Sequence, residues 1–140
     1  MISFLFFALH LSSITTIELN CMALTIYHEA RGETEQGQAA VGHVILNRVK
    51  SLRYPDNVCA VVAQKNSFSW YWDDKSDTIT KPAKFKQILL LSTQLWNEAV
   101  PDNTHGATHY FNPDKADPVW ARKMTYLVTL DNHRFYRRKK

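Results

Sequence analysis

The sequence predicts a helix-rich α+β fold in one domain, with small β elements. A chain of 140 residues fits one domain and is long enough to bury a core. Its composition, 45% hydrophobic and 21% charged, is ordinary for a globular protein. Helical periodicity dominates the first hundred residues, and short extended segments follow, which is the order expected for an α+β fold.

The first predicted helix of the domain runs over residues 17–30. Apolar residues recur there with helical spacing, and Gly32 then supplies a stop. The recurring residues are Ile17, Cys21, Leu24, Tyr27 and Ala30.

A second helix is predicted to begin after Thr34. The Thr34 hydroxyl can accept a hydrogen bond from a free amide of the first turn, and Glu35 places a negative charge near that end. The apolar run that follows begins with small residues, as expected where helices cross closely, and it ends near Lys50.

The later segments are less regular. Residues 58–63 are apolar and fit a helix or a strand equally. Residues 67–72 alternate polar and aromatic side chains and predict a loop or short hairpin, whereas 83–100 has helical spacing. Residues 106–113 are predicted to be irregular or extended, and 125–130 to form a strand.

The two ends differ from the body. Residues 1–16 are apolar, shorter than the roughly 20 residues of a membrane span, and fit a signal, an anchor or part of the fold. Much of the net charge of +4 lies near the carboxyl end. We therefore divide the chain into residues 1–16, a domain over 17–136, and a basic tail over 137–140 that is either solvated or attracted to a polyanion.

Two cysteines, Cys21 and Cys59, have no partner at metal-ligand spacing. A disulfide between them would contribute on the order of 4 kcal/mol and would require an oxidising compartment. The sequence leaves both the free and the paired states open.

His28-Glu29 resembles the start of the zinc motif H-E-x-x-H, but Gly32 stands where the second histidine would be needed. We therefore predict no metal site. A carboxyl beside the buried face of a helix holds its proton more readily, which suits the acid of glycosidic cleavage. This makes Glu29 the candidate catalytic residue.

A second polar cluster, Thr108-His109-Tyr110, follows Gly106 and offers three side chains that can line a sugar site. No G-x-S-x-G elbow, phosphate loop or dinucleotide fingerprint is present in the sequence. We predict no cofactor.

The sequence resembles the SleB-like cell wall hydrolase family, the catalytic domain of spore cortex-lytic enzymes. The most specific blocks are CMALTIYHEARGE at 21–33 and GQAAVGHVILNRV at 37–49. Weaker blocks are Phe68-Ser69-Trp70, ATHY at 107–110, PVWA at 118–121 and HRFY at 133–136.

The resemblance implies a lysozyme-like or lytic-transglycosylase-like fold that cleaves the β-1,4 bond between N-acetylmuramic acid and N-acetylglucosamine in peptidoglycan. It implies that Glu29 is the acid/base and that a single carboxyl suffices, giving a 1,6-anhydro-muramyl product. A muramidase-type hydrolysis would need a partner carboxylate roughly 5–9.5 Å away, for which Asp73, Asp74 or Glu33 would have to serve.

The remaining predictions concern the groove and the setting. We expect the substrate-binding residues to be Gln38, Ser69, Trp70, Thr108, His109 and Tyr110. Trp120 fits a groove or a core, and the core is favoured. We expect a monomer that acts on the bacterial cell wall, in the periplasm or outside the cell, of bacterial or phage origin, without nucleic acid. The alternative from another class is a non-catalytic module that binds wall glycan or nucleic acid.

Overall fold

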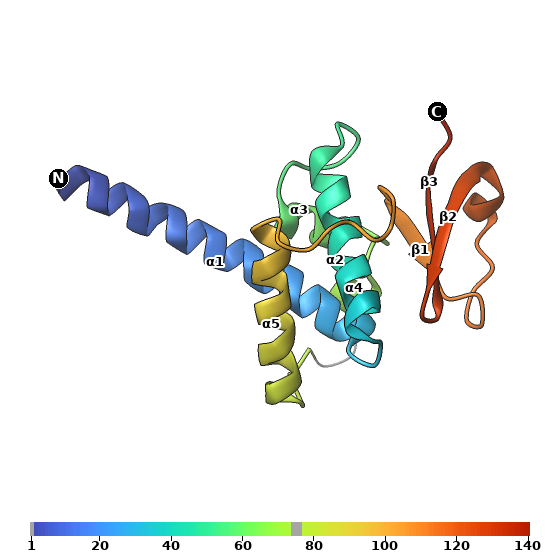
Figure 1. Ribbon diagram of the computed structural model, residues 1–140, viewed down its shortest axis with the longest axis horizontal. Helices are drawn as coiled ribbons and strands as arrows, with labels where there is room; N and C mark the ends of the chain where they lie inside the picture. The colour runs from blue at the N-terminus through green and yellow to red at the C-terminus, as the bar shows by residue number, and fades with distance from the viewer. Residues whose placement is uncertain (1, 74–76) are drawn as a thin grey trace.

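The computed structural model describes residues 2–73 and 77–140, with side chains from residue 13 onward. A group of helices comes first in the chain, and a three-stranded antiparallel sheet lies at the end of the molecule opposite the amino terminus (Figure 1). The elements are α1 (Ile2–Ala30), α2 (Glu35–Lys50), α3 (Val58–Ala63), α4 (Ser69–Trp72), α5 (Pro82–Trp96), β1 (His109–Phe111), the 3-10 helix η1 (Val119–Lys123), β2 (Met124–Leu130) and β3 (His133–Arg138).

Helix α1 is the centre of the helical part, because α2, α3, α4 and α5 all pack against its second half. Its buried apolar residues are Met22, Ala23, Ile26, Tyr27 and Ala30. The predicted apolar stripe was partly wrong: Ile17 is 60% exposed and Leu24 is only half-buried. Several elements surround this half of the helix, so more than one face of it is buried and a single stripe does not describe its core positions.

The helix runs past the expected boundary at residue 16 without a break, and its first half extends away from the other helices (Figure 1). Within the part of the chain that the structure describes, no helix combines the length and the apolar character needed to cross a membrane.

Helix α2 begins and ends where the sequence predicts. Thr34 caps it by accepting a hydrogen bond from Gly37 N at 3.3 Å, and it ends at Lys50. Gly42 lies where α2 crosses α1 and α5, since a Cβ there would press against Leu95 and Ile26. The small residues of this helix therefore permit close helix packing.

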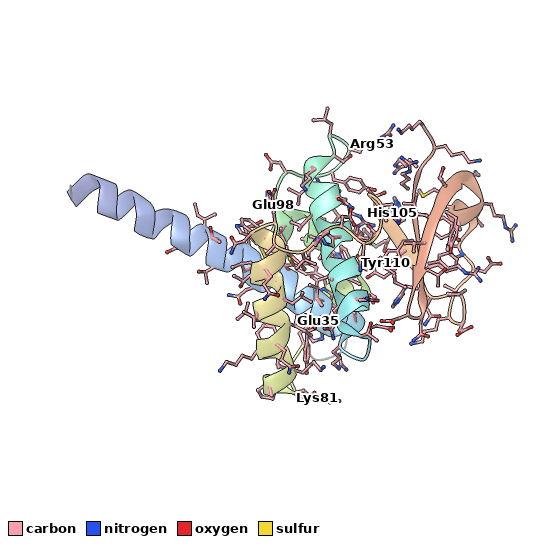
Figure 2. All side chains as sticks on the ribbon, in the orientation of Figure 1. Glu35, Arg53, Lys81, Glu98, His105 and Tyr110 are labelled. Carbon is pink, nitrogen blue, oxygen red and sulfur yellow. A yellow bond between two sulfur atoms is a disulfide. The ribbon has the colours of Figure 1, made fainter. Side chains whose placement is uncertain are left out.

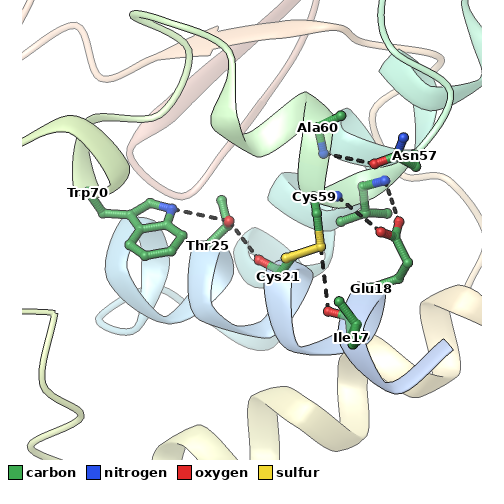
Figure 3. The surroundings of a disulfide bond; sticks show 9 residues. Ile17, Glu18, Cys21, Thr25, Asn57, Cys59, Ala60 and Trp70 are labelled. Carbon is green, nitrogen blue, oxygen red and sulfur yellow. Dashed lines mark hydrogen bonds between the residues drawn. A yellow bond between two sulfur atoms is a disulfide. The ribbon is translucent and has the colours of Figure 1, made fainter. Parts of the chain in front are cut away.

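Residues 58–63 form helix α3, which settles the choice between helix and strand. Asn57 caps its amino end by accepting a hydrogen bond from Ala60 N at 2.9 Å. The Glu18 carboxylate, from α1, accepts hydrogen bonds from Val58 N and Cys59 N at the same end (Figure 3). The predicted alternative of a disulfide is also realised, because Cys21 and Cys59 are bonded and so join α1 to α3.

Two predicted elements need correction, one in its type and one in its end. Ser69–Trp72 forms the short helix α4 rather than a loop or hairpin, because its aromatic side chains pack on α1 and on one another instead of alternating across a strand. Helix α5 stops at Trp96 rather than near residue 100, and Glu98 then adopts a positive φ of 59°. The predicted extended segment near 109 and the strand over 125–130 are observed as β1 and β2.

Strand β3 is the central strand of the sheet, in the order β1-β3-β2, and the sequence did not predict it. Arg137 and Arg138 belong to this strand, so the expected tail begins inside the sheet. Phe135 faces the helices and packs with Ala40 and Val44 of α2. On the opposite face the half-buried Trp120 packs edge-on against Phe111 and Tyr136, so it is not part of the buried core that was favoured for it.

Removing the disulfide is expected to destabilise the fold. For a sequence separation of 38 residues the chain-entropy model gives about 4 kcal/mol. Replacing Cys21 and Cys59 by alanine should lower the free energy of unfolding in urea by up to that amount. Reductant should destabilise the wild type and leave the double variant unchanged. An equal effect of reductant on both proteins would contradict the prediction.

Candidate functional site

Glu29 lies in the last turn of α1, half-buried, and both of its carboxylate oxygens are contacted. Ser69 Oγ donates to Oε1 at 3.2 Å, and the Trp70 backbone N–H donates to the same oxygen at 3.5 Å. Tyr110 OH donates to Oε2 at 3.5 Å. Residues from α1, α4 and β1, far apart in the sequence, thus meet at one carboxyl group.

The indole of Trp70 holds α4 against α1. Its Nε1 donates to Thr25 Oγ1 at 3.1 Å, and Thr25 in turn donates to the Cys21 carbonyl at 2.8 Å (Figure 3). The ring also stacks on His28, with centroids 5.0 Å apart and planes 16° from parallel. Because of these contacts, Ser69 Oγ and Trp70 N stay within reach of Glu29. Thr25 and His28 were not among the predicted site residues.

Tyr110 lies on β1, on the side of the sheet that meets the helices (Figure 2). From there its hydroxyl reaches Glu29. Its ring packs on Phe135 at 5.6 Å and meets His133 edge-on at 5.1 Å. Burial and the neighbouring Glu29 carboxylate raise the pKa of Tyr110 well above its usual value. The phenol is therefore a hydrogen-bond donor throughout the neutral pH range.

The structure divides the predicted cluster Thr108-His109-Tyr110. Successive residues of a strand point to opposite faces, so His109 lies against Trp120 while Tyr110 faces Glu29. Thr108 Oγ1 is bonded to His109 Nδ1 at 2.9 Å, and the Thr108 carbonyl accepts from Arg48 Nε at 2.7 Å. Burial, aided by Arg48 and Arg138, lowers the pKa of His109 to about 4, which keeps the ring neutral at pH 7.

Gln38 supports the turn that follows α1. Gln38 is only 5% exposed, and its Nε2 lies 3.3 Å from both the Ala30 and the Glu33 carbonyl oxygens. Those carbonyls belong to the end of α1 and the turn after it. Gln38 therefore stabilises the end of the helix that carries Glu29.

His133 is a residue near the site that the sequence interpretation missed. Its Nδ1 lies 3.5 Å from Glu33 Oε1, and its ring touches Tyr110. Burial lowers the pKa of His133, and the Glu33 and Glu29 carboxylates oppose that shift. The only signal in the sequence was its place in the closing HRFY block, since nothing local links it to Glu29.

Of the three carboxylates that could partner Glu29 in hydrolysis, the structure describes two, Glu33 and Asp73. Glu33 contacts His133 and Asn132. Asp73 follows α4 and is exposed. Asp74 lies outside the described residues. Within the described parts of the chain, no three or more His, Cys, Asp and Glu residues are grouped to hold a metal ion.

A hollow of about 800 Å³ lies away from Glu29, where α1, α2 and the end of α5 meet. Its walls combine apolar residues such as Leu46 and Val100 with polar ones such as His43 and Asp102. The contacts at Glu29, rather than this hollow, bring together the residues predicted to act.

Comparison with known proteins identifies relatives over most of the chain. The family model described as cell wall hydrolase matches residues 32–136. The spore cortex-lytic enzyme of Halalkalibacterium halodurans is 34% identical over 119 residues, which cover 84% of this chain and 34% of the relative. That of Bacillus subtilis is 31% identical over 124 residues, covering 84% of this chain and 37% of the relative. The chain thus spans about a third of the length of these curated relatives.

Two solved structures share the fold. The catalytic domain of the germination-specific lytic transglycosylase SleB from Bacillus anthracis has a TM-score of 0.71 and 32% identity, covering 86% of this chain and 93% of that one. The catalytic domain of the Bacillus cereus SleB protein has a TM-score of 0.69 and 31% identity, covering 86% and 89%. These matches confirm the helix-rich α+β fold and the predicted resemblance. The chain belongs to the cell wall hydrolase family.

Proposed function

We propose that this protein is a peptidoglycan lytic transglycosylase that cleaves the β-1,4 bond between N-acetylmuramic acid and N-acetylglucosamine. The observation that carries the proposal is the single half-buried carboxyl of Glu29, contacted at both oxygens by Ser69, Trp70 and Tyr110. The solved relative from Bacillus anthracis is itself a lytic transglycosylase, and 86% of this chain aligns with it.

In the proposed mechanism Glu29 first gives its proton to the glycosidic oxygen, and the bond from that oxygen to the muramyl anomeric carbon breaks. The resulting carboxylate is stabilised by the donors that face it, the Ser69 and Tyr110 hydroxyls and the Trp70 amide. The carboxylate then takes the proton of the muramyl C6 hydroxyl as that oxygen attacks the anomeric carbon. No water is consumed, the product carries a 1,6-anhydro ring, and Glu29 is again protonated.

The position of Glu33 favours this chemistry over hydrolysis. A muramidase mechanism uses a second carboxylate on the opposite side of the sugar. Glu33 is instead 13% exposed and paired with His133. The muramidase reaction therefore stands as the second candidate.

The setting of the reaction is also part of the proposal. We propose that the protein is a monomer that works outside the cytoplasm, where the Cys21–Cys59 disulfide is stable. Basic residues at the carboxyl end, Arg137, Arg138, Lys139 and Lys140, would attract the anionic envelope.

Replacing Glu29 by glutamine keeps the size of the side chain and removes the proton that it donates. We expect at least about a hundredfold loss of cell wall clearing, the contribution usual for a general acid. Clearing of purified peptidoglycan is followed by turbidity, with circular dichroism to check folding. Glu35→Gln, in the exposed first turn of α2, is the matched control and should clear like the wild type. A fully active Glu29→Gln protein would refute the assignment.

The products distinguish the two chemistries. Mass spectrometry of digested glycan should show anhydro-muramyl ends, which are lighter by one water than reducing ends. Reducing ends as the main product would identify a muramidase, and Glu29 would then need a second carboxylate.

Replacing Tyr110 by phenylalanine keeps the ring against Phe135 and His133 and removes the donor to Glu29. We expect kcat to fall about tenfold with little change in KM, because the hydroxyl stabilises the carboxylate formed during the reaction. Steady-state rates on soluble glycan strands measure both constants. A rise in KM alone would mean that Tyr110 binds substrate instead.

A further inference from the structure

Two turns from distant parts of the chain meet beside the site. The α1–α2 turn carries Glu33 and Thr34, and the β2–β3 turn carries Asp131 and Asn132, followed by His133. Asp131 Oδ2 accepts hydrogen bonds from Thr34 N at 2.9 Å and from Thr34 Oγ1 at 2.6 Å. Asn132 Nδ2 lies 3.5 Å from both Glu33 oxygens, and His133 Nδ1 lies 3.5 Å from Glu33 Oε1. We call these five residues the clasp.

The clasp differs from an ordinary surface contact. The His133 and Glu33 side chains are 11% and 13% exposed, whereas those of the surface pair Arg122–Asp117 are 76% and 82% exposed. Exposed ion pairs of that second kind contribute little. Within the clasp, the contact between His133 and Glu33 is shielded from water, which makes it stronger, whereas Thr34, Asp131 and Asn132 lie at the surface.

The backbone around the clasp is shaped for close approach. A Cβ on Gly37 would overlap the Asp131 carboxylate and would lie 3.1 Å from Glu33 Cβ, so a larger residue there would require the Asp131 side chain to move. Asp131 adopts a φ of 51°, a left-handed conformation that is unusual for a residue other than glycine. Its two hydrogen bonds to Thr34 compensate for that conformation.

The clasp connects the two sides of the site. Glu33 follows Glu29 by four residues and lies in the turn after α1, which ends at Ala30. His133 opens β3, and its ring meets the Tyr110 ring edge-on at 5.1 Å and 90°. Tyr110 in turn donates to Glu29 at 3.5 Å. Any shift of the β2–β3 turn relative to the α1–α2 turn would therefore move the Tyr110 hydroxyl relative to Glu29.

We propose that the clasp holds the sheet against the end of α1, so that Glu33 and His133 act as positioning residues that keep the Tyr110 hydroxyl on Glu29. This inference rests on the proposed function, in which Glu29 is the acid. It assigns Glu33 a positioning role in place of the second catalytic carboxylate that hydrolysis would require.

His133→Phe is the first test, because it keeps a ring against Tyr110 and removes the nitrogen that faces Glu33. We expect kcat to fall about tenfold while KM changes less than about twofold, as for a misplaced group that acts in the transition state. In a Tyr110→Phe background the same change should cost less than about twofold more, because residues that act through one group are not additive.

Gly37→Ala is the second test and decides the matter if His133→Phe does not fold. It displaces Asp131 while leaving Tyr110, Glu33 and His133 in the sequence, and alanine favours a helix more than glycine does. We expect the same loss of kcat, again absent in the Tyr110→Phe background. Arg122→Gln is the control, since it breaks the exposed pair with Asp117, and it should retain wild-type constants.

Several outcomes would overturn the inference. Wild-type kcat in a folded Gly37→Ala protein, or an equal loss with and without the Tyr110 hydroxyl, would show that the clasp does not act through Tyr110. A change confined to KM would do the same. If the wild type cleaved no glycan, or Glu29→Gln stayed active, the proposed function itself would fail and the inference with it.

Discussion

Burial of the second half of α1 among the other helices determines where Glu29 lies, and the rest of the site is arranged around that position. Met22, Ile26 and Tyr27 are fully enclosed, so the helix has little freedom to shift or rotate. The Tyr27 hydroxyl additionally accepts hydrogen bonds from Thr80 N and Lys81 N, which ties the loop before α5 to the same turn of helix. A carboxyl group at the end of such a helix is preorganised before substrate arrives.

The other groups reach Glu29 because each is anchored to α1 or to what packs on it. Trp70 donates a hydrogen bond to Thr25 and stacks on His28, the residue that precedes Glu29. The disulfide and the Glu18 carboxylate hold α3 to an earlier part of the same helix (Figure 3). Thus the contacts that stabilise the helical core are also the contacts that place Ser69 and Trp70.

The sheet is the more independent part of the site. Phe135 of the sheet packs on Ala40 and Val44 of α2. The sheet also meets the α1–α2 turn at Asp131, Asn132 and His133. Among the described residues, Tyr110 is the one residue of the sheet that donates a hydrogen bond to the Glu29 carboxyl. The position of one hydroxyl therefore depends on how the whole sheet sits against the helices, which is why small contacts in turns have consequences for catalysis.

The sequence by itself determined the local features. The Thr34 cap, the end of α2 at Lys50 and the candidate acid Glu29 follow from residue types within one or two turns of helix, where spacing and capping chemistry decide the structure. Ser69, Trp70 and Tyr110 were predicted to bind substrate, and in the structure all three donate hydrogen bonds to Glu29.

Only the tertiary structure decided which residues meet across long separations. His109 and Tyr110 lie on opposite faces of the sheet because neighbouring strand residues face opposite ways. Gln38 binds the carbonyl of Ala30 at the end of α1. The fold also brings His133 close to the site, although it follows Glu29 by 104 residues in the sequence. The first basic residues near the carboxyl end belong to β3, the central strand of the sheet. The physical reason is that periodicity records which face of an element is apolar, whereas pairing between distant elements depends on packing of the complete core.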